Sequence, residues 1–82
     1  MYYVYIVKCS DDTYYTGIAK DIPKRIEEHN HSPKGAKYTK ARRPVKLMYE
    51  ESCEDRSLAS KREYAIKRLT RVEKMILIST KT

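Results

Sequence analysis

The sequence predicts an α+β fold in which a small three-stranded antiparallel sheet is flanked by helices, in the element order ββαβαα. Two observations predict this order. Runs rich in β-branched residues and tyrosine, typical of strands, occupy residues 2–9, 14–18 and 44–50. Apolar residues at helical spacing occur in residues 21–29 and 54–69.

The first two strands are joined by a short segment of turn residues. Residues 10–13 read Ser-Asp-Asp-Thr, which is turn chemistry, so the strands on either side should pair as a hairpin. This loop holds no glycine, and the sequence therefore leaves the type of turn open.

The helix that follows the hairpin has boundary signals at both ends. Asp21 suits the N-cap position, and Pro23 falls in the first turn, where its missing N–H costs no hydrogen bond. Helical spacing continues to His29, and the helix should end near residues 30–33. Residues 32–43 show no apolar periodicity and are expected to form a loop.

The C-terminal third is expected to form two helices. The first, over residues 54–69, should bury one face. That face holds Leu58, Ala59, Ala65, Ile66 and Leu69. Thr70 and Glu73 have the spacing of a capping box, which predicts a short last helix over residues 72–78.

Composition limits the class of protein. With 82 residues and no repeat or linker, we expect one domain over residues 1–82. A hydrophobic content of 40% excludes a disordered tail. Cys9 and Cys53 are too few for a disulfide framework and are interpreted as reduced thiols, which favours a cytoplasmic location. No apolar run approaches the ~18 residues of a membrane span, so no membrane partner is expected.

The net charge points to a polyanionic partner. Lysine and arginine number 18 against 11 acidic residues, which gives a formal charge of +7 and a pI near 9.5. Nucleic acid is the first candidate partner of so basic a domain. A lysine-rich surface that serves only solubility is the alternative.

Two tyrosines of the predicted hairpin are candidates for a site. Because side chains alternate along a strand, Tyr3 and Tyr5 share one face of the first strand, and Tyr15 and Gly17 share one face of the second. If these faces coincide, the Tyr5 and Tyr15 phenols lie close together beside a glycine that admits a closely approaching group. The alternative is an aromatic cross-strand pair that only stabilises the hairpin.

Arg25 and His29 are four residues apart and should lie on one stripe of the first helix. A guanidinium there could bind a phosphate bidentately, and the imidazole could transfer a proton near neutral pH. A solvated arginine beside a half-buried histidine is the alternative. A zinc site using His29 and His31 lacks a third and fourth ligand at suitable spacing.

Glu63 lies at the border of the buried face of the predicted 54–69 helix. A carboxylate there needs a cation, either a basic side chain or a hard ion such as Mg²⁺ or Mn²⁺, which prefers oxygen ligands. An ion pair with Lys67, four residues later, is the alternative.

Residues 32–49 carry six basic side chains and no acidic one. A solvated loop usually mixes the two signs, so this composition favours contact with a phosphate backbone. The candidate nucleic-acid-binding residues are Lys34, Lys37, Tyr38, Lys40, Arg42 and Arg43.

Taken in order, these features resemble the GIY-YIG nuclease domain over essentially the whole chain. Tyr3-Val4-Tyr5 stands where that family has Gly-Ile-Tyr, and Tyr15-Thr16-Gly17 where it has Tyr-Ile-Gly. Residues 20–29, with Arg25 and His29, resemble its first helix, and Glu63 resembles its metal-binding glutamate. Residues 35–39 and 43–44 are similar to the small stand-alone bacterial members and to the Slx-type nucleases.

The resemblance implies metal-dependent hydrolysis of phosphodiester bonds in nucleic acid, with DNA as the first substrate and DNA repair or processing as the setting. Glu63 would hold a single Mg²⁺ or Mn²⁺, and Arg25 would bind the scissile phosphate. Tyr5, beside Tyr15, would orient or deprotonate the attacking water with the help of His29. As the base, Tyr5 needs its pKa lowered from ~10 by about 2–3 units; otherwise Tyr5 only positions water and His29 takes the proton.

Two departures bear on specificity rather than on chemistry. Tyr3 replaces the first glycine of the family motif, and nothing in the chain resembles the DNA-binding or zinc modules that accompany this domain in homing endonucleases, UvrC or Slx-type enzymes. A protein partner could supply the missing specificity. The alternatives are a non-catalytic nucleic-acid-binding protein that retains the fold, and an adaptor that docks an acidic protein. For the enzyme, we expect Tyr5, Tyr15, Arg25, His29 and Glu63 to line one concave surface.

Overall fold

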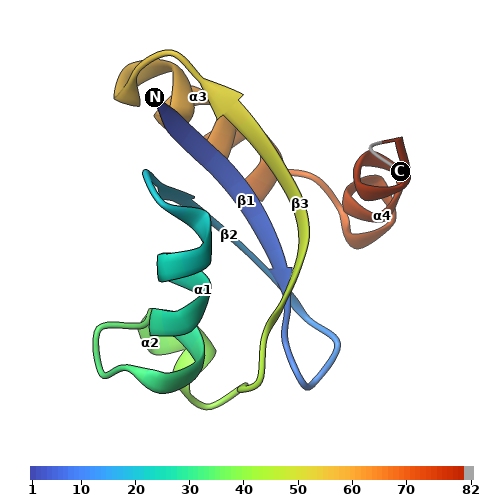
Figure 1. Ribbon diagram of the computed structural model, residues 1–82. Coiled ribbons are helices and arrows are strands. Elements are labelled where there is room, and N and C mark those ends of the chain that lie inside the picture. The colour runs from blue at the N-terminus through green and yellow to red at the C-terminus, as the bar shows by residue number, and fades with distance from the viewer. Residues whose placement is uncertain (81–82) are drawn as a thin grey trace.

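The computed structural model describes residues 1–80 (Figure 1). Its elements are β1 (Tyr2–Lys8), β2 (Tyr14–Ala19), α1 (Ile22–His31), α2 (Lys37–Lys40), β3 (Lys46–Cys53), α3 (Arg56–Lys67) and α4 (Arg71–Thr80). The predicted α+β class and ββαβαα order are confirmed. The single turn of α2 interrupts the segment that the sequence predicts to be a loop.

The three strands form one antiparallel sheet in the order β2-β1-β3. β1 is central because its middle residues, Val4 to Val7, are apolar or aromatic on both faces and are almost completely buried. The β1–β2 turn contains no glycine, and Asp12 adopts the left-handed conformation with φ of 67°. A bulge between Ile6 and Val7 interrupts the pairing of β1 with β3.

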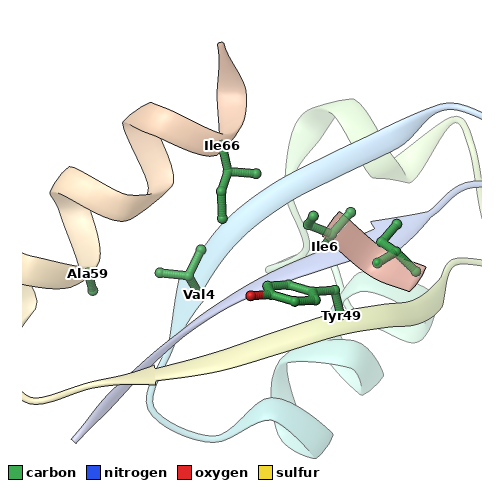
Figure 2. Packing of buried hydrophobic residues seen from close by; sticks show 6 residues of the cluster. Val4, Ile6, Tyr49, Ala59 and Ile66 are labelled. Carbon is green, nitrogen blue, oxygen red and sulfur yellow. The ribbon is translucent and has the colours of Figure 1, made fainter. Parts of the chain in front are cut away.

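Each face of the sheet carries its own apolar cluster. On one face, Tyr5, Val7, Cys9, Ile22 and Val45 form a cluster that joins the sheet to α1. On the other face, a second cluster joins the sheet to α3 and α4 (Figure 1). Figure 2 shows Ile66 of α3 above Val4 and Ala59 of the same helix to its left, with Ile6 and Tyr49 of the strands in the same cluster.

The predicted helix starts are confirmed by hydrogen bonds. The Asp21 carboxylate accepts from the backbone N–H of Lys24 at 3.1 Å, as an N-cap does. At α4, the Thr70 N–H donates to the Glu73 carboxylate at 2.9 Å and the Glu73 N–H donates to the Thr70 hydroxyl at 3.2 Å. This reciprocal pair is the capping box that the sequence predicts.

Two predictions about the C-terminal half need correction. The third strand begins at Lys46, because the backbone N–H and C=O of Val45 pair with the Asn30 side chain at 2.7 and 3.2 Å instead of with a strand. Leu58 and Ala65 are exposed, since α3 buries only the narrow stripe of Ala59 and Ile66 against the sheet.

Within residues 1–80, no helix combines the length and the apolar character that crossing a bilayer requires.

Candidate active site

The site is built around Tyr5, which lies opposite Gly17 in the β1–β2 ladder. Tyr5 is 1% exposed, and its ring lies against the glycine, in the space where any other residue would put its Cβ atom. Tyr5, Tyr15 and Gly17 therefore lie on one face of the hairpin, as the alternation of side chains along the strands predicts. The group that approaches Gly17 closely is the Tyr5 phenol itself.

His29 extends from α1 onto this phenol. It is completely buried, and its Nε2 lies 2.6 Å from the Tyr5 hydroxyl, while its Nδ1 lies 2.8 Å from the hydroxyl of Thr39 on α2. Burial, together with the nearby Arg25 cation, lowers the pKa of His29 from 6.5 to about 4. His29 is therefore neutral at physiological pH, and one of its ring nitrogens carries a lone pair that can accept a hydrogen bond.

Tyr15 contributes the second phenol of the site. Its ring packs edge-on against His29 with centroids 5.5 Å apart, and stacks on Tyr38 of α2 at 5.9 Å with an interplanar angle of 23°. The Arg42 guanidinium lies 4.0 Å from the centroid of the Tyr38 ring. α2 is thereby attached to the hairpin through aromatic contacts, and Tyr15 is held against His29.

Arg25 is the partly exposed cation of the site. Its Nη1 donates to the Glu28 carboxylate at 3.0 Å and to the backbone carbonyl of Lys34 at 3.1 Å. Its charge is close enough to Tyr5 to lower the pKa of that phenol. A pocket of about 240 Å³ opens beside Arg25, and Lys20 and Lys24 also line it. A larger pocket of about 650 Å³ is lined by Tyr3, Ile22 and Leu47 among others, and neither Tyr5 nor Tyr15 lines it.

The pKa of Tyr5 moves in the opposite direction from the one that a phenolate base requires. Burial raises it from 10.0 to about 12, Tyr15 and Glu63 add to the rise, and Arg25 opposes it. The condition for Tyr5 to act as a phenolate base is thus not met in the protein alone, because burial raises the pKa of the phenol more than the Arg25 guanidinium lowers it.

Glu63 approaches from the other side of the sheet. It lies on the stripe of α3 between Ala59 and Ile66, which pack on the face opposite Tyr5. Its charge still raises the pKa of Tyr5, and its carboxylate is paired with Lys67 at 3.4 Å. The helices that carry Glu63 and His29 therefore cover opposite faces of the sheet. That all five candidate residues line one concave surface stays a prediction.

The donor set decides which metal would suit Glu63. Within residues 1–80, no group of three or more His, Cys, Asp or Glu side chains is arranged around a common point. Both ring nitrogens of His29 are already hydrogen-bonded, to Tyr5 and to Thr39. One partly exposed carboxylate fits Mg²⁺ or Mn²⁺, which takes most of its ligands from water and phosphate.

The basic segment divides into exposed lysines and internally bonded arginines. Lys34, Lys37 and Lys40 are exposed. Arg42 donates to the Asp11 carboxylate at 3.0 Å and to the Tyr38 carbonyl at 2.9 Å. Arg43 donates to the backbone carbonyls of Glu28, His29 and Ser32.

Sequence reasoning did not assign Thr39 to the site, and it gave Arg43 to nucleic-acid binding although its guanidinium bonds to backbone carbonyls. The Thr39 hydroxyl contacts Nδ1 of His29, and the Arg43 guanidinium donates to backbone carbonyls at the C-terminal end of α1. Gly35 is needed in the same place, because a Cβ there would lie 2.7 Å from the Glu28 carbonyl oxygen. A signal was present in residues 35–39, since a glycine and a threonine within a basic loop suggest close packing as well as phosphate contact.

Comparisons with known proteins place this geometry in a family. The family model described as GIY-YIG catalytic domain matches residues 1–75. A UPF0213 protein of Desulfotalea psychrophila is 60% identical over 77 residues, covering 94% of this chain and 70% of the relative. A UPF0213 protein of Staphylococcus aureus is 58% identical over 77 residues, covering 94% of this chain and 93% of the relative.

Two solution NMR structures resemble the whole fold. A UPF0213 protein from Bacillus halodurans matches with a TM-score of 0.63 and 41% identity, over 99% of this chain and 86% of that one. A protein from E. faecalis matches with a TM-score of 0.65 and 41% identity, over 96% and 83%. With the catalytic-domain model covering residues 1–75 and the tyrosines of both motif segments meeting at His29, the chain belongs to the GIY-YIG family.

Proposed function

We propose that the protein is a metal-dependent endonuclease that hydrolyses phosphodiester bonds in nucleic acid. The observation that carries this proposal is the contact between the Tyr5 hydroxyl and a neutral, buried His29 nitrogen at 2.6 Å, with the Arg25 cation beside it. A base and a phosphate-binding cation from α1 are thereby brought to a hydroxyl from β1. Simple structural packing does not require that combination.

The raised pKa of Tyr5 favours a proton relay over a free phenolate. The attacking water gives its proton to the Tyr5 oxygen while Tyr5 gives its own proton to His29, so the phenol stays neutral throughout. Arg25 binds the scissile phosphate and stabilises its added negative charge. To reach the phosphate, the guanidinium would leave the Glu28 carboxylate and the Lys34 carbonyl and turn within its partly exposed site.

Glu63 is the residue of this chain that would hold a divalent ion, which when bound neutralises the departing oxygen. To do so, the carboxylate leaves its exposed partner Lys67. β2 is an edge strand, so groups of α3 and α1 can meet around its free side. Two regions offer positive charge to the flanking nucleic-acid backbone. One is the pocket that Lys20, Lys24 and Arg25 line, and the other is the group of exposed lysines near α2.

DNA is the first substrate class to test, and repair or processing is the setting that the family resemblance suggests. A second candidate function, nucleic-acid binding without cleavage, is favoured by one observation. The Tyr5 phenol is 1% exposed and strongly disfavours ionisation. In that case the same side chains would serve only to hold α1 and α2 on the hairpin.

A cleavage panel separates the two functions. Labelled duplex, branched and single-stranded DNA and RNA are incubated with Mg²⁺, Mn²⁺ or EDTA. The enzyme is expected to cut at least one substrate, only with the metal, and Glu63→Ala should abolish cutting while binding stays equal or stronger. Glu54→Ala, which removes an equal charge from an exposed position just before α3, should cut normally. Wild-type protein that cuts nothing, or Glu63→Ala that cuts equally well, contradicts the proposal.

A further inference from the structure

Thr39 is not among the residues to which the family resemblance gives a catalytic role, yet its side chain is completely buried against the site. Its hydroxyl is 2.8 Å from Nδ1 of His29 and 2.9 Å from the backbone carbonyl oxygen of Ala36, at the start of α2. With the Tyr5–His29 contact at 2.6 Å, these contacts form a continuous chain from Tyr5 to Ala36.

Counting protons fixes the direction of this chain. Three close contacts must be served by one proton each, and the Tyr5 hydroxyl, the neutral imidazole and the Thr39 hydroxyl supply one proton apiece. The Ala36 carbonyl can only accept, so the threonine proton points to it. The threonine oxygen then accepts from Nδ1–H, and Nε2 is left as the acceptor for Tyr5.

The opposite direction fails at both ends. With the proton on Nε2, Tyr5 would accept from His29, and its own proton would need another acceptor; the nearby Arg25 guanidinium can only donate. At the other end, the threonine proton would turn to Nδ1. Two oxygens would then lie 2.9 Å apart, at Thr39 and Ala36, with no proton between them.

We infer that Thr39 is a positioning residue that holds His29 in the Nδ1–H tautomer, so that the Nε2 lone pair faces the Tyr5 hydroxyl. This inference rests on the proposed function for its purpose, because only a proton-accepting Nε2 can complete the relay. The tautomer itself is a property of the free protein. The role of α2, a single turn between the basic residues, is then to bring this hydroxyl under the imidazole.

The test is the ¹⁵N NMR spectrum of the His29 ring in the full chain near neutral pH, which distinguishes protonated from unprotonated ring nitrogens. Wild type and Thr39→Ser are expected to show a protonated Nδ1 and an unprotonated Nε2. Thr39→Val, which keeps the shape and removes the hydroxyl, should move population to the Nε2–H form. A wild-type Nε2–H tautomer, or a Thr39→Val spectrum identical to wild type, overturns the inference. If Thr39→Val does not fold, Thr39→Ala takes its place, and a Thr39→Ala spectrum identical to wild type likewise overturns the inference.

Kinetics on a substrate that the wild type cuts provide the second measurement. General acid–base catalysis contributes ~10²–10⁴-fold, so Thr39→Val should lose at least about tenfold in kcat with KM little changed. Thr39→Ser should restore the rate. Thr70→Val removes a capping hydroxyl far from the site and serves as the matched control. Equal loss in Thr70→Val and Thr39→Val would contradict the positioning role. Because the NMR measurement needs no cleavage, a protein that cuts nothing refutes the proposed function without deciding the tautomer.

Discussion

Gly17 lies directly opposite Tyr5 in the β1–β2 ladder, and a Cβ atom at Gly17 would lie 2.5 Å from the Tyr5 hydroxyl oxygen and 2.7 Å from its Cζ. The glycine is therefore required by packing and not by backbone conformation, since its φ is not positive. The phenol fills the volume that a side chain at position 17 would occupy. That placement brings the hydroxyl to His29.

Gly17→Ala should destabilise the protein by about 1–3 kcal/mol, because a buried ring must move away from the new methyl group. Urea unfolding measures this loss. In a Tyr5→Leu background the same change should cost much less, since the obstructing hydroxyl and Cζ are gone. An equal cost in both backgrounds would show that the penalty does not come from the Tyr5 ring.

His29 should make stability depend on pH between about 4 and 6.5. Its pKa in the folded state is about 4, below the ordinary 6.5, so in this window the unfolded chain binds more protons than the folded one. Stability therefore rises with pH through the window, by up to about 3 kcal/mol from this group, and the contribution is complete above pH 6.5. His29→Gln, which cannot titrate, should flatten the curve measured by urea unfolding at pH 4.5 and 7. An unchanged slope would mean that His29 is protonated when folded.

The exposed lysines should dominate non-specific binding. Changing Lys34, Lys37 and Lys40 to alanine should reduce the slope of log K against log salt, without changing stability. In the wild type, each lysine that neutralises a duplex phosphate releases that phosphate's counterions. The slope should therefore fall by about 0.9 for each such contact that the variant loses. Fluorescence anisotropy with labelled duplex DNA at several salt concentrations measures the slope. If the slope does not change, the nucleic-acid-binding surface lies elsewhere on the protein.

Arg43 should behave differently from those lysines. Its guanidinium binds three backbone carbonyls around the end of α1, and charge-assisted hydrogen bonds of this kind contribute ~1.5–3 kcal/mol. Arg43→Ala should therefore lower the melting temperature by several degrees, with little effect on the salt slope beyond that of one removed charge. Lys46→Ala, at an exposed position shortly after it, is the control for charge. If Arg43→Ala keeps the wild-type stability but binds nucleic acid more weakly, Arg43 acts in nucleic-acid binding and not in holding the end of α1.

The alternation of side chains along β1 and β2 was enough to predict that Tyr5, Tyr15 and Gly17 share a face, and helical spacing was enough to place Arg25 and His29 on one stripe. Periodicity also places Glu63 on the buried stripe of its helix. It does not say which face of the sheet that helix covers, because that depends on the connection after β3. The roles of Thr39 and Arg43 depend on how α2 docks against α1, which is a long-range contact without a local pattern.

Cleavage by Tyr5→Phe tests the central claim most directly, because only one hydroxyl is removed from the relay. With the substrate and metal that the wild type uses, Tyr5→Phe is expected to bind equally well and to cut ~10²–10⁴-fold more slowly. Tyr64→Phe removes a phenol hydroxyl from the exposed side of α3 and should cut at the wild-type rate. A folded Tyr5→Phe protein that cuts as fast as wild type would contradict the account.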